Sequence, residues 1–245
     1  MLNELAFIKS RVKSCTFCDT ILVAKDLTLI WIKFRDEKME TQTKENQSKL
    51  TPQEIKQLLI EGNQRFASGK MMERDLLEQV KVTSVGQYPH TIVLGCIDSR
   101  ATTEQIFDQG IGDVFNARVA GNIVNEDVLG SLEYACKVAG SKLVMVLGHT
   151  KCGAVTSACH GVKLGHISNL LDKINPAIEK AKLSFKDITT PEAVNEVGKE
   201  NVLNSMKEIR ERSPILYALE RKGKIKIIGG MYDVQTGLVE FYIGA

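Results

Sequence analysis

The stretch TIVLG-CIDSR, residues 91–100, decides the architecture of this chain and places its chemistry. Its first half is a short run of β-prone residues, which indicates a buried strand, and its second half is a polar motif that begins with a cysteine. The same arrangement recurs in LVMVLG-HTKCG, residues 143–153. In open α/β sheets, ligands bind at the carboxyl ends of the strands. We therefore expect the two polar motifs to meet at one edge of a sheet.

Segments with helical spacing of apolar residues alternate with such strand-like runs along the chain. The first helix is predicted to begin after Thr51, because Pro52 suits the first helical position and Glu54 completes a capping box, and Gly69 is its predicted stop. After a charged connection and the strand at 91–95, the other predicted elements are a short helix at 104–107, a strand at 114–119, a helix at 124–138, the strand at 143–148, helices at 153–158, 167–181, 191–212 and 214–223, a strand at 225–228, and a hairpin at 231–243 that turns near 236–237. This alternation predicts an α/β fold with a mainly parallel central sheet flanked by helices.

Residues 1–49 differ from the rest and are predicted to be an N-terminal extension, with the main domain at 50–245. Little helical periodicity is found there, and the polar run at 40–48 is interpreted as a linker. Disorder and an overlong start assignment are the two interpretations of this extension. Charges at Lys25, Asp26 and Lys33 interrupt its apolar stretch, so it suits neither a membrane span nor a signal peptide. Cys15 and Cys18 form a lone Cys-x-x-Cys, which is weak support for a redox or metal role.

Composition narrows the function classes. The 245 residues carry a formal net charge of +2, which gives no field that would favour nucleic acid or an anionic membrane. With no membrane span or signal peptide predicted, we expect a cytoplasmic protein. The six cysteines show no disulfide framework, and Cys136 and Cys159 lie in apolar patterns typical of buried thiols.

Two cysteines and one histidine in the motifs suit a catalytic zinc site. Cys96 would contribute one ligand from the first strand end, and His149 and Cys152 would contribute two more from one turn. Thiolate sulfur and imidazole nitrogen are typical Zn²⁺ ligands, and three protein ligands leave one position open for water or substrate. Water bound at such a site has a pKa of about 7.

A carboxylate and a guanidinium accompany the predicted metal ligands. Asp98 can accept a hydrogen bond from metal-bound water or become a fourth ligand, and Arg100 can pair with it and keep it ionised. Taken singly, a cysteine at a strand end, an Asp-Ser-Arg turn and a histidine after a strand are more often structural. Their joint occurrence, with glycines at the flanks, favours a metal-dependent catalytic site.

The pair Cys-x-Asp-x-Arg and His-x-x-Cys resembles the β-class carbonic anhydrases, and the resemblance covers about residues 50–245. It implies a β-carbonic anhydrase-like catalytic domain and zinc-dependent reversible hydration of carbon dioxide to bicarbonate and a proton. The family's zinc ligands correspond to Cys96, His149 and Cys152, and its catalytic dyad corresponds to Asp98 and Arg100. Residues 1–49 have no counterpart in this resemblance.

The resemblance also implies substrate contacts and an assembly. Gln87 is expected to hydrogen-bond substrate, and Phe115 and Tyr134 are expected to line an apolar pocket, partly from the neighbouring subunit. A homodimer or homotetramer is the implied state. Some members bind inhibitory bicarbonate at a second site through a Trp, an Arg and a Tyr. Arg118 and Tyr232 match two of these, but Val93 stands at the Trp position, so the resemblance does not decide whether bicarbonate inhibits this protein.

Two alternatives belong to different classes of function. The first is a hydrolase for carbon disulfide or carbonyl sulfide on the same scaffold, which would use the same metal set. The second is a non-catalytic zinc or bicarbonate-binding protein, in which a structural metal would have four protein ligands. His160 and His166 are candidate proton shuttles, although surface or capping roles suit them better.

Overall fold

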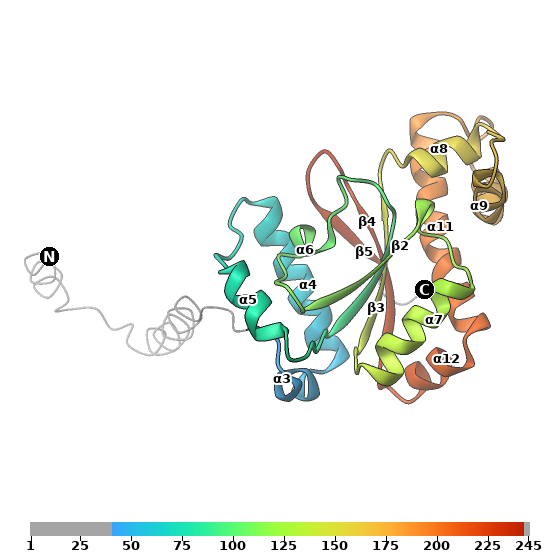
Figure 1. The fold of residues 1–245 in the computed structure, drawn as a ribbon. Coiled ribbons are helices and arrows are strands. Elements are labelled where there is room, and N and C mark those ends of the chain that lie inside the picture. The colour runs from blue at the N-terminus through green and yellow to red at the C-terminus, as the bar shows by residue number, and fades with distance from the viewer. Residues whose placement is uncertain (1–40, 243–245) are drawn as a thin grey trace, which may run out of the picture. The chain divides into compact units, whose positions relative to one another are not determined.

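A computed structural model describes residues 41–242 and shows a central sheet with helices on both sides (Figure 1). The described residues, 41–242, form one compact unit. The strands are β1 (Thr91–Gly95), β2 (Val114–Arg118), β3 (Leu143–His149), β4 (Lys226–Tyr232) and β5 (Val239–Tyr242). The helices and helical turns are α3 (Lys44–Lys49), α4 (Pro52–Ala67), α5 (Leu76–Thr83), α6 (Thr103–Ile106), η1 (Ala120–Asn122), α7 (Glu126–Glu133), η2 (Tyr134–Val138), α8 (Gly153–Cys159), α9 (Ile167–Leu171), η3 (Asp172–Ile174), α10 (Asn175–Ala181), α11 (Pro191–Arg212) and α12 (Pro214–Arg221).

The sheet has the order β2-β1-β3-β4-β5. Strands β1 to β4 pair in parallel, and β5 pairs antiparallel with β4 through a hairpin. In the central pair, Thr91 lies opposite Leu143 and Gly95 opposite Leu147, so both strands point to the same edge. The predicted mainly parallel α/β fold is therefore confirmed.

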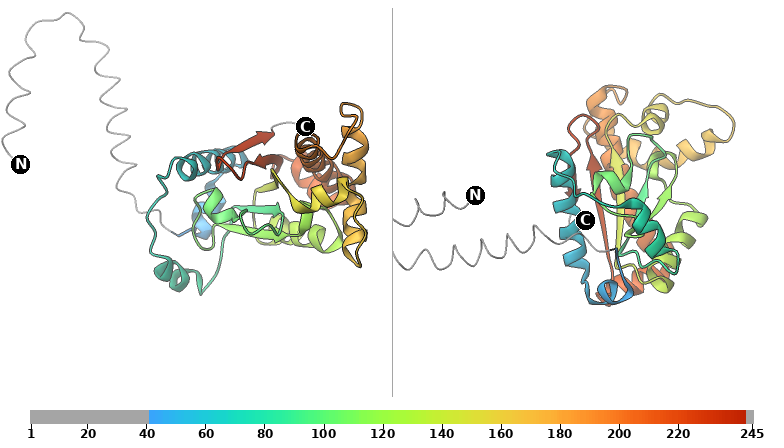
Figure 2. Two further views of the ribbon diagram at one scale, coloured as in Figure 1. Left: turned by 90° about the horizontal axis from the view of Figure 1, so that it is seen from above. Right: turned by 60° about the vertical axis from the view of Figure 1, so that its left-hand side comes forward.

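Alternate residues of the central strands enter two separate cores. Ile92 and Leu94 of β1 pack with helices α7, α11 and α12, whereas Val93 packs with α4 and α6. The blue and teal helices α3 to α5 accordingly lie on one side of the sheet, and the orange helix α11 lies on the other (Figures 1 and 2). Because both faces of β1 and β3 are covered, these strands consist of nearly continuous apolar runs.

Several predicted elements differ in detail. The charged connection before β1 contains helix α5, which sequence patterning missed because several of its apolar side chains are exposed. The predicted linker at 40–48 is wrong in part, since Thr43 caps helix α3 and the amide of Gln47 is buried against the carbonyls of Pro89 and Ala139. The predicted helix at 124–138 becomes α7 followed by a π-helical turn, and the one at 167–181 divides into α9, η3 and α10.

Two further expectations concern membranes and the extension. No helix within residues 41–242 is long and apolar enough to cross a bilayer. The pair Cys15 and Cys18 lies outside the described residues.

Helix α4 approaches α6 so closely that one position of α4 admits only glycine. Its start agrees with the sequence, with Thr51 and Glu54 forming a reciprocal capping box. At Gly62, a Cβ atom would overlap the backbone carbonyl of Phe107, a fully buried residue. The clash partner is backbone and cannot turn away as a flexible side chain would.

We predict that Gly62→Ala lowers the free energy of unfolding by roughly 1–3 kcal/mol, since α4 must move away from Phe107. Gln64→Ala, at an exposed position of the same helix, is the control and should change stability by about 0.5 kcal/mol or less. Urea unfolding measures both. Equal stability of the Gly62→Ala variant and the parent would contradict the close approach.

Candidate functional site

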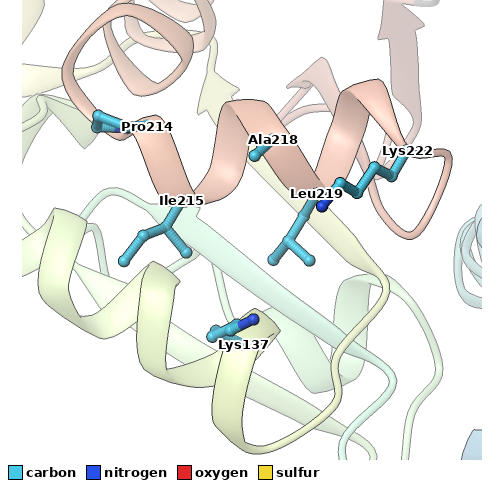
Figure 3. A pocket seen from close by; sticks show the side chains of 6 residues that line it. All are labelled: Lys137, Pro214, Ile215, Ala218, Leu219 and Lys222. Carbon is cyan, nitrogen blue, oxygen red and sulfur yellow. The ribbon is translucent and has the colours of Figure 1, made fainter.

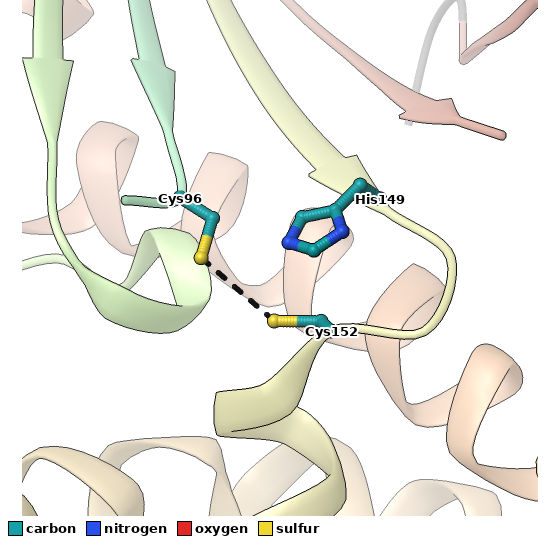
Figure 4. A group of neighbouring side chains, drawn as sticks. All are labelled: Cys96, His149 and Cys152. Carbon is teal, nitrogen blue, oxygen red and sulfur yellow. Dashed lines mark hydrogen bonds between the residues drawn. The ribbon is translucent and has the colours of Figure 1, made fainter. Parts of the chain in front are cut away.

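Three buried ligand atoms converge at the carboxyl edge of the sheet. Cys96 directly follows β1, His149 is the last residue of β3, and Cys152 caps helix α8 (Figure 4). Their ligand atoms lie within 4.8 Å of one another, and the two Sγ atoms are 3.9 Å apart. In residues 41–242, these three form the group of His, Cys and acidic residues that is close enough to share a metal ion.

The donors fit a tetrahedral metal ion of the zinc type. Two thiolates bound at about 2.3 Å in tetrahedral geometry would be separated by about 3.8 Å, close to the observed 3.9 Å. His149 Nδ1 lies 3.0 Å from the carbonyl of Thr150, so Nδ1 carries the proton and donates to that carbonyl. The Nε2 atom then has a lone pair available to bind a metal ion. That Nε2 atom is buried and has no hydrogen-bond partner among the described residues. An unpaired buried nitrogen is costly, and a metal ion would satisfy it.

The electrostatics of the two thiols also favour a cation. The hydrogen bond from the Cys152 thiol lowers the pKa of Cys96 to about 4, with a further contribution from His149. The same hydrogen bond and burial hold the pKa of Cys152 far above its usual range. Ionisation of one thiol thus opposes ionisation of the other. A cation bound between the sulfur atoms would favour the thiolate form of both.

Asp98 and Arg100 form an ion pair beside the three donors. Asp98 Oδ1 accepts hydrogen bonds from the backbone N–H and Nε of Arg100 at 2.9 Å, and Oδ2 accepts one from Nη2 at 2.7 Å. The guanidinium holds the pKa of Asp98 well below its usual range. Asp98 Oδ2 lies 3.8 Å from His149 Nε2, so the carboxylate faces the donor cluster while it is paired with Arg100.

The loop that carries Cys96 and Asp98 is held by Arg118 and Gly121, and the sequence did not predict this role for either residue. Arg118, at the end of β2, donates from Nε to the carbonyl of Cys96 at 2.9 Å and from Nη2 to that of Asp98 at 2.6 Å. The backbone N–H of Gly121 donates to Cys96 Sγ at 3.3 Å. The sequence signal was the stretch NARVAGN, residues 116–122, which spans the end of β2 and the following turn and resembles the family, but it does not reveal these contacts.

The predicted substrate contacts lie away from the donors of the same chain. The rings of Phe115 and Tyr134 are 6.5 Å apart and line a hollow of about 660 Å³. Phe115 lies opposite Ile92 near the start of β1, whereas Cys96 follows its end; four residues of strand span about 13 Å. Gln87 is exposed in the loop before β1. One chain therefore does not bring Gln87, Phe115 and Tyr134 to its own metal ligands.

Other candidate positions are also placed by the structure. Val93 is fully buried in β1, Tyr232 is buried at the end of β4, and Arg118 is engaged with the ligand loop. His160 and His166 are exposed. A second hollow of about 300 Å³ lies between η2 and α12 and is lined by Lys137, Pro214, Ile215, Ala218, Leu219 and Lys222 (Figure 3). Neither hollow includes a metal-ligand candidate.

Comparison with known proteins agrees with this geometry. A family model described as carbonic anhydrase matches residues 91–239. The chain is 34% identical over 191 residues to a carbonic anhydrase of Mycolicibacterium smegmatis, covering 74% of this chain and 89% of the relative. It is 32% identical over 185 residues to carbonic anhydrase 2 of Mycobacterium tuberculosis, covering 73% and 87%. The solved structure of the β-carbonic anhydrase CafA of Aspergillus fumigatus is similar with a TM-score of 0.61 and 29% identity, covering 69% of this chain and 82% of that one.

We predict that the purified protein retains about one transition-metal ion per chain and that Cys152→Ser or His149→Ala abolishes retention, since two donors hold a metal poorly. Cys159→Ala is the matched control, because Cys159 is also buried near the site but does not belong to the donor group. Elemental analysis after dialysis measures all four proteins. Full metal content in Cys152→Ser would rule out this donor set.

Proposed function

The chain belongs to the β-class carbonic anhydrases, and we propose that it hydrates carbon dioxide reversibly to bicarbonate and a proton, with Zn²⁺ held by Cys96, His149 and Cys152. The observation that carries the proposal is the convergence of two thiols and an unpartnered imidazole nitrogen beside the Asp98–Arg100 ion pair. Stopped-flow hydration of carbon dioxide, with zinc quantified on the same preparation, tests it. Zinc-loaded protein without hydration activity would refute it.

Zinc bound by this set would act as a Lewis acid that makes water a nucleophile near neutral pH. Two thiolates would partly neutralise the charge of the ion, which makes a nearby hydrogen-bond acceptor for water more important. Asp98 supplies one, because its carboxylate faces His149 Nε2 and accepts at both oxygens. Arg100 keeps that carboxylate ionised and holds its orientation through two side-chain hydrogen bonds.

We further propose that Asp98 works as the partner of Arg100 and not as a fourth ligand. Its two oxygens are occupied by Arg100, and its carboxylate does not belong to the close donor group within residues 41–242. This arrangement leaves a coordination position free, as catalytic zinc sites require. A purely structural metal would instead have four protein ligands, so the three-donor group favours catalysis over a structural or sensing role.

The substrate pocket is proposed to be completed by a second subunit. Phe115 and Tyr134 lie about four strand residues from the donor edge of their own chain, and Tyr134 is 57% exposed. A neighbouring copy in a homodimer, or in a homotetramer built from dimers, could present this aromatic surface and Gln87 to the metal ligands. The apolar rings would then surround carbon dioxide, which has no net charge.

Carbon disulfide or carbonyl sulfide hydrolysis remains a rival reaction, because the same donors would serve it. Assays with carbon dioxide and carbonyl sulfide on one zinc-loaded preparation separate the two activities. We expect hydration of carbon dioxide to dominate.

We predict that Asp98→Asn retains zinc but lowers hydration activity by a factor on the order of a hundred or more, because the neutral amide loses both the negative charge that orients water and the ion pair with Arg100. Arg100→Ala should behave similarly. The double variant should be about as slow as either single variant, because the two residues act as a unit. Stopped-flow kinetics with matched zinc content measure this. Parent-like activity in Asp98→Asn would exclude the proposed role of the pair.

We also predict that activity rises from pH 7 to above pH 8. Asp98 cannot cause the rise, because Arg100 lowers its pKa and the carboxylate is ionised throughout this range. The ion pair contributes stability above the unfolded carboxyl pKa of about 3.9 and loses it only as the pH falls through the lower folded value. Asp98→Asn should therefore reduce the height of the pH profile without removing its rise. A flat parent profile from pH 7 to pH 8.5 would contradict an ionisation that limits the rate there.

A further inference from the structure

The turn η1 adopts an unusual backbone conformation next to Cys96. Gly121 has φ 69° and Asn122 has φ 43°, so two successive residues are left-handed. A side chain at Gly121 would be strained by this φ, and its Cβ would approach Ile174 Cδ1 to 3.0 Å. Glycine adopts this conformation readily, whereas Asn122 does so at a cost and depends on surrounding contacts to hold it.

Two buried polar side chains of α11 supply these contacts. Asn201 Nδ2 donates to the carbonyl of Gly121 at 2.7 Å, and Ser205 Oγ donates to the carbonyl of Asn122 at 3.1 Å. The two residues are four apart, so they lie on one face of the helix, and they are 1% and 2% exposed. Buried polar side chains are nearly always hydrogen-bonded, and these two donate to consecutive carbonyls of the turn.

The turn that they hold contacts the metal-ligand candidate directly. The N–H of Gly121 donates to Cys96 Sγ at 3.3 Å, and the carbonyl of the same glycine is the one that Asn201 binds. Asn201 therefore orients the residue whose N–H meets the sulfur. Ser205 binds the carbonyl of the following residue, one peptide farther along the turn. The two side chains are closely matched in burial but differ in this relation to Cys96.

We propose that Asn201 is a positioning residue of the metal centre, which acts through Gly121 to maintain the N–H···S hydrogen bond on Cys96. A hydrogen bond to a thiolate sulfur withdraws electron density from it, and such contacts around a ligand tune a bound metal. Asn201 thus limits how strongly the Cys96 thiolate donates to the ion and keeps the metal a better Lewis acid. The inference rests on the metal-binding part of the proposed function but not on the identity of the substrate.

Substitution of Co²⁺ for the native metal in the full chain gives a readout that does not depend on activity. Thiolate-to-cobalt charge transfer produces an absorption band whose energy falls when the sulfur becomes more electron-rich. We expect this band to move to longer wavelength in Asn201→Ala, and also in Asn201→Val, which keeps more of the side-chain volume.

Ser205→Ala is the matched control, because it removes a hydrogen bond from the same helix to the same turn. We expect it to lower stability but to leave the band at the parent position. A band that stays at the parent position in whichever Asn201 variants fold, or that moves equally in Ser205→Ala, would overturn the proposal. If the parent protein binds Co²⁺ without a thiolate charge-transfer band, both the proposed cysteine ligands and this inference are refuted. A parent that shows the band but does not hydrate carbon dioxide would refute only the proposed reaction.

Discussion

The parallel pairing of β1 with β3 is the constraint on which the rest of this structure depends. Gly95 lies opposite Leu147, so both strands run toward the same edge and β3 continues two residues farther to His149. A shift of one residue would exchange the two faces of β1 between the cores on either side. The alternate burial of Ile92, Val93 and Leu94 in different cores fixes the register. The candidate metal ligands after β1 and β3 come together because packing on both faces of the sheet fixes the register of these two strands.

At the carboxyl edge of the sheet, the ionisable side chains are close enough for the charge of each to affect that of its neighbour. The two thiols lie 3.9 Å apart, and ionisation of Cys96 together with burial raises the pKa of Cys152. Asp98 would face the donor cluster unpaired if Arg100 did not bind it. Arg118 binds the backbone carbonyls of Cys96 and Asp98 and so holds the loop that carries both. The Nε2 atom of His149 is buried without a hydrogen-bond partner, which would be unfavourable if the three residues served packing alone. A metal ion bound by the three residues would satisfy the sulfur atoms and the imidazole together.

The two ends of the sheet have different chemistry. Metal-ligand candidates gather at the carboxyl ends of β1 and β3, while Phe115 and Tyr134 form an aromatic surface near the start of β1 and β2. A catalytic site that needs both would require two copies of the chain. Under this proposal, assembly and catalysis are linked, because a single subunit has the reactive groups without the apolar pocket.

The sequence by itself determined the alternation of strands and helices, the capping of α4 and the donor set, because each depends on local patterns or on residue type. Burial of Cys96, His149 and Cys152 at a common edge followed from their place after apolar runs. Only the tertiary structure decided that Arg118 binds the ligand loop and that Asn201, 80 residues beyond Gly121, holds the turn against Cys96. It also revealed α5, whose exposed apolar residues hide its pattern, and the separation of Phe115 from the donors. These features arise from contacts between segments far apart in the chain, and neither periodicity nor spacing carries information about them.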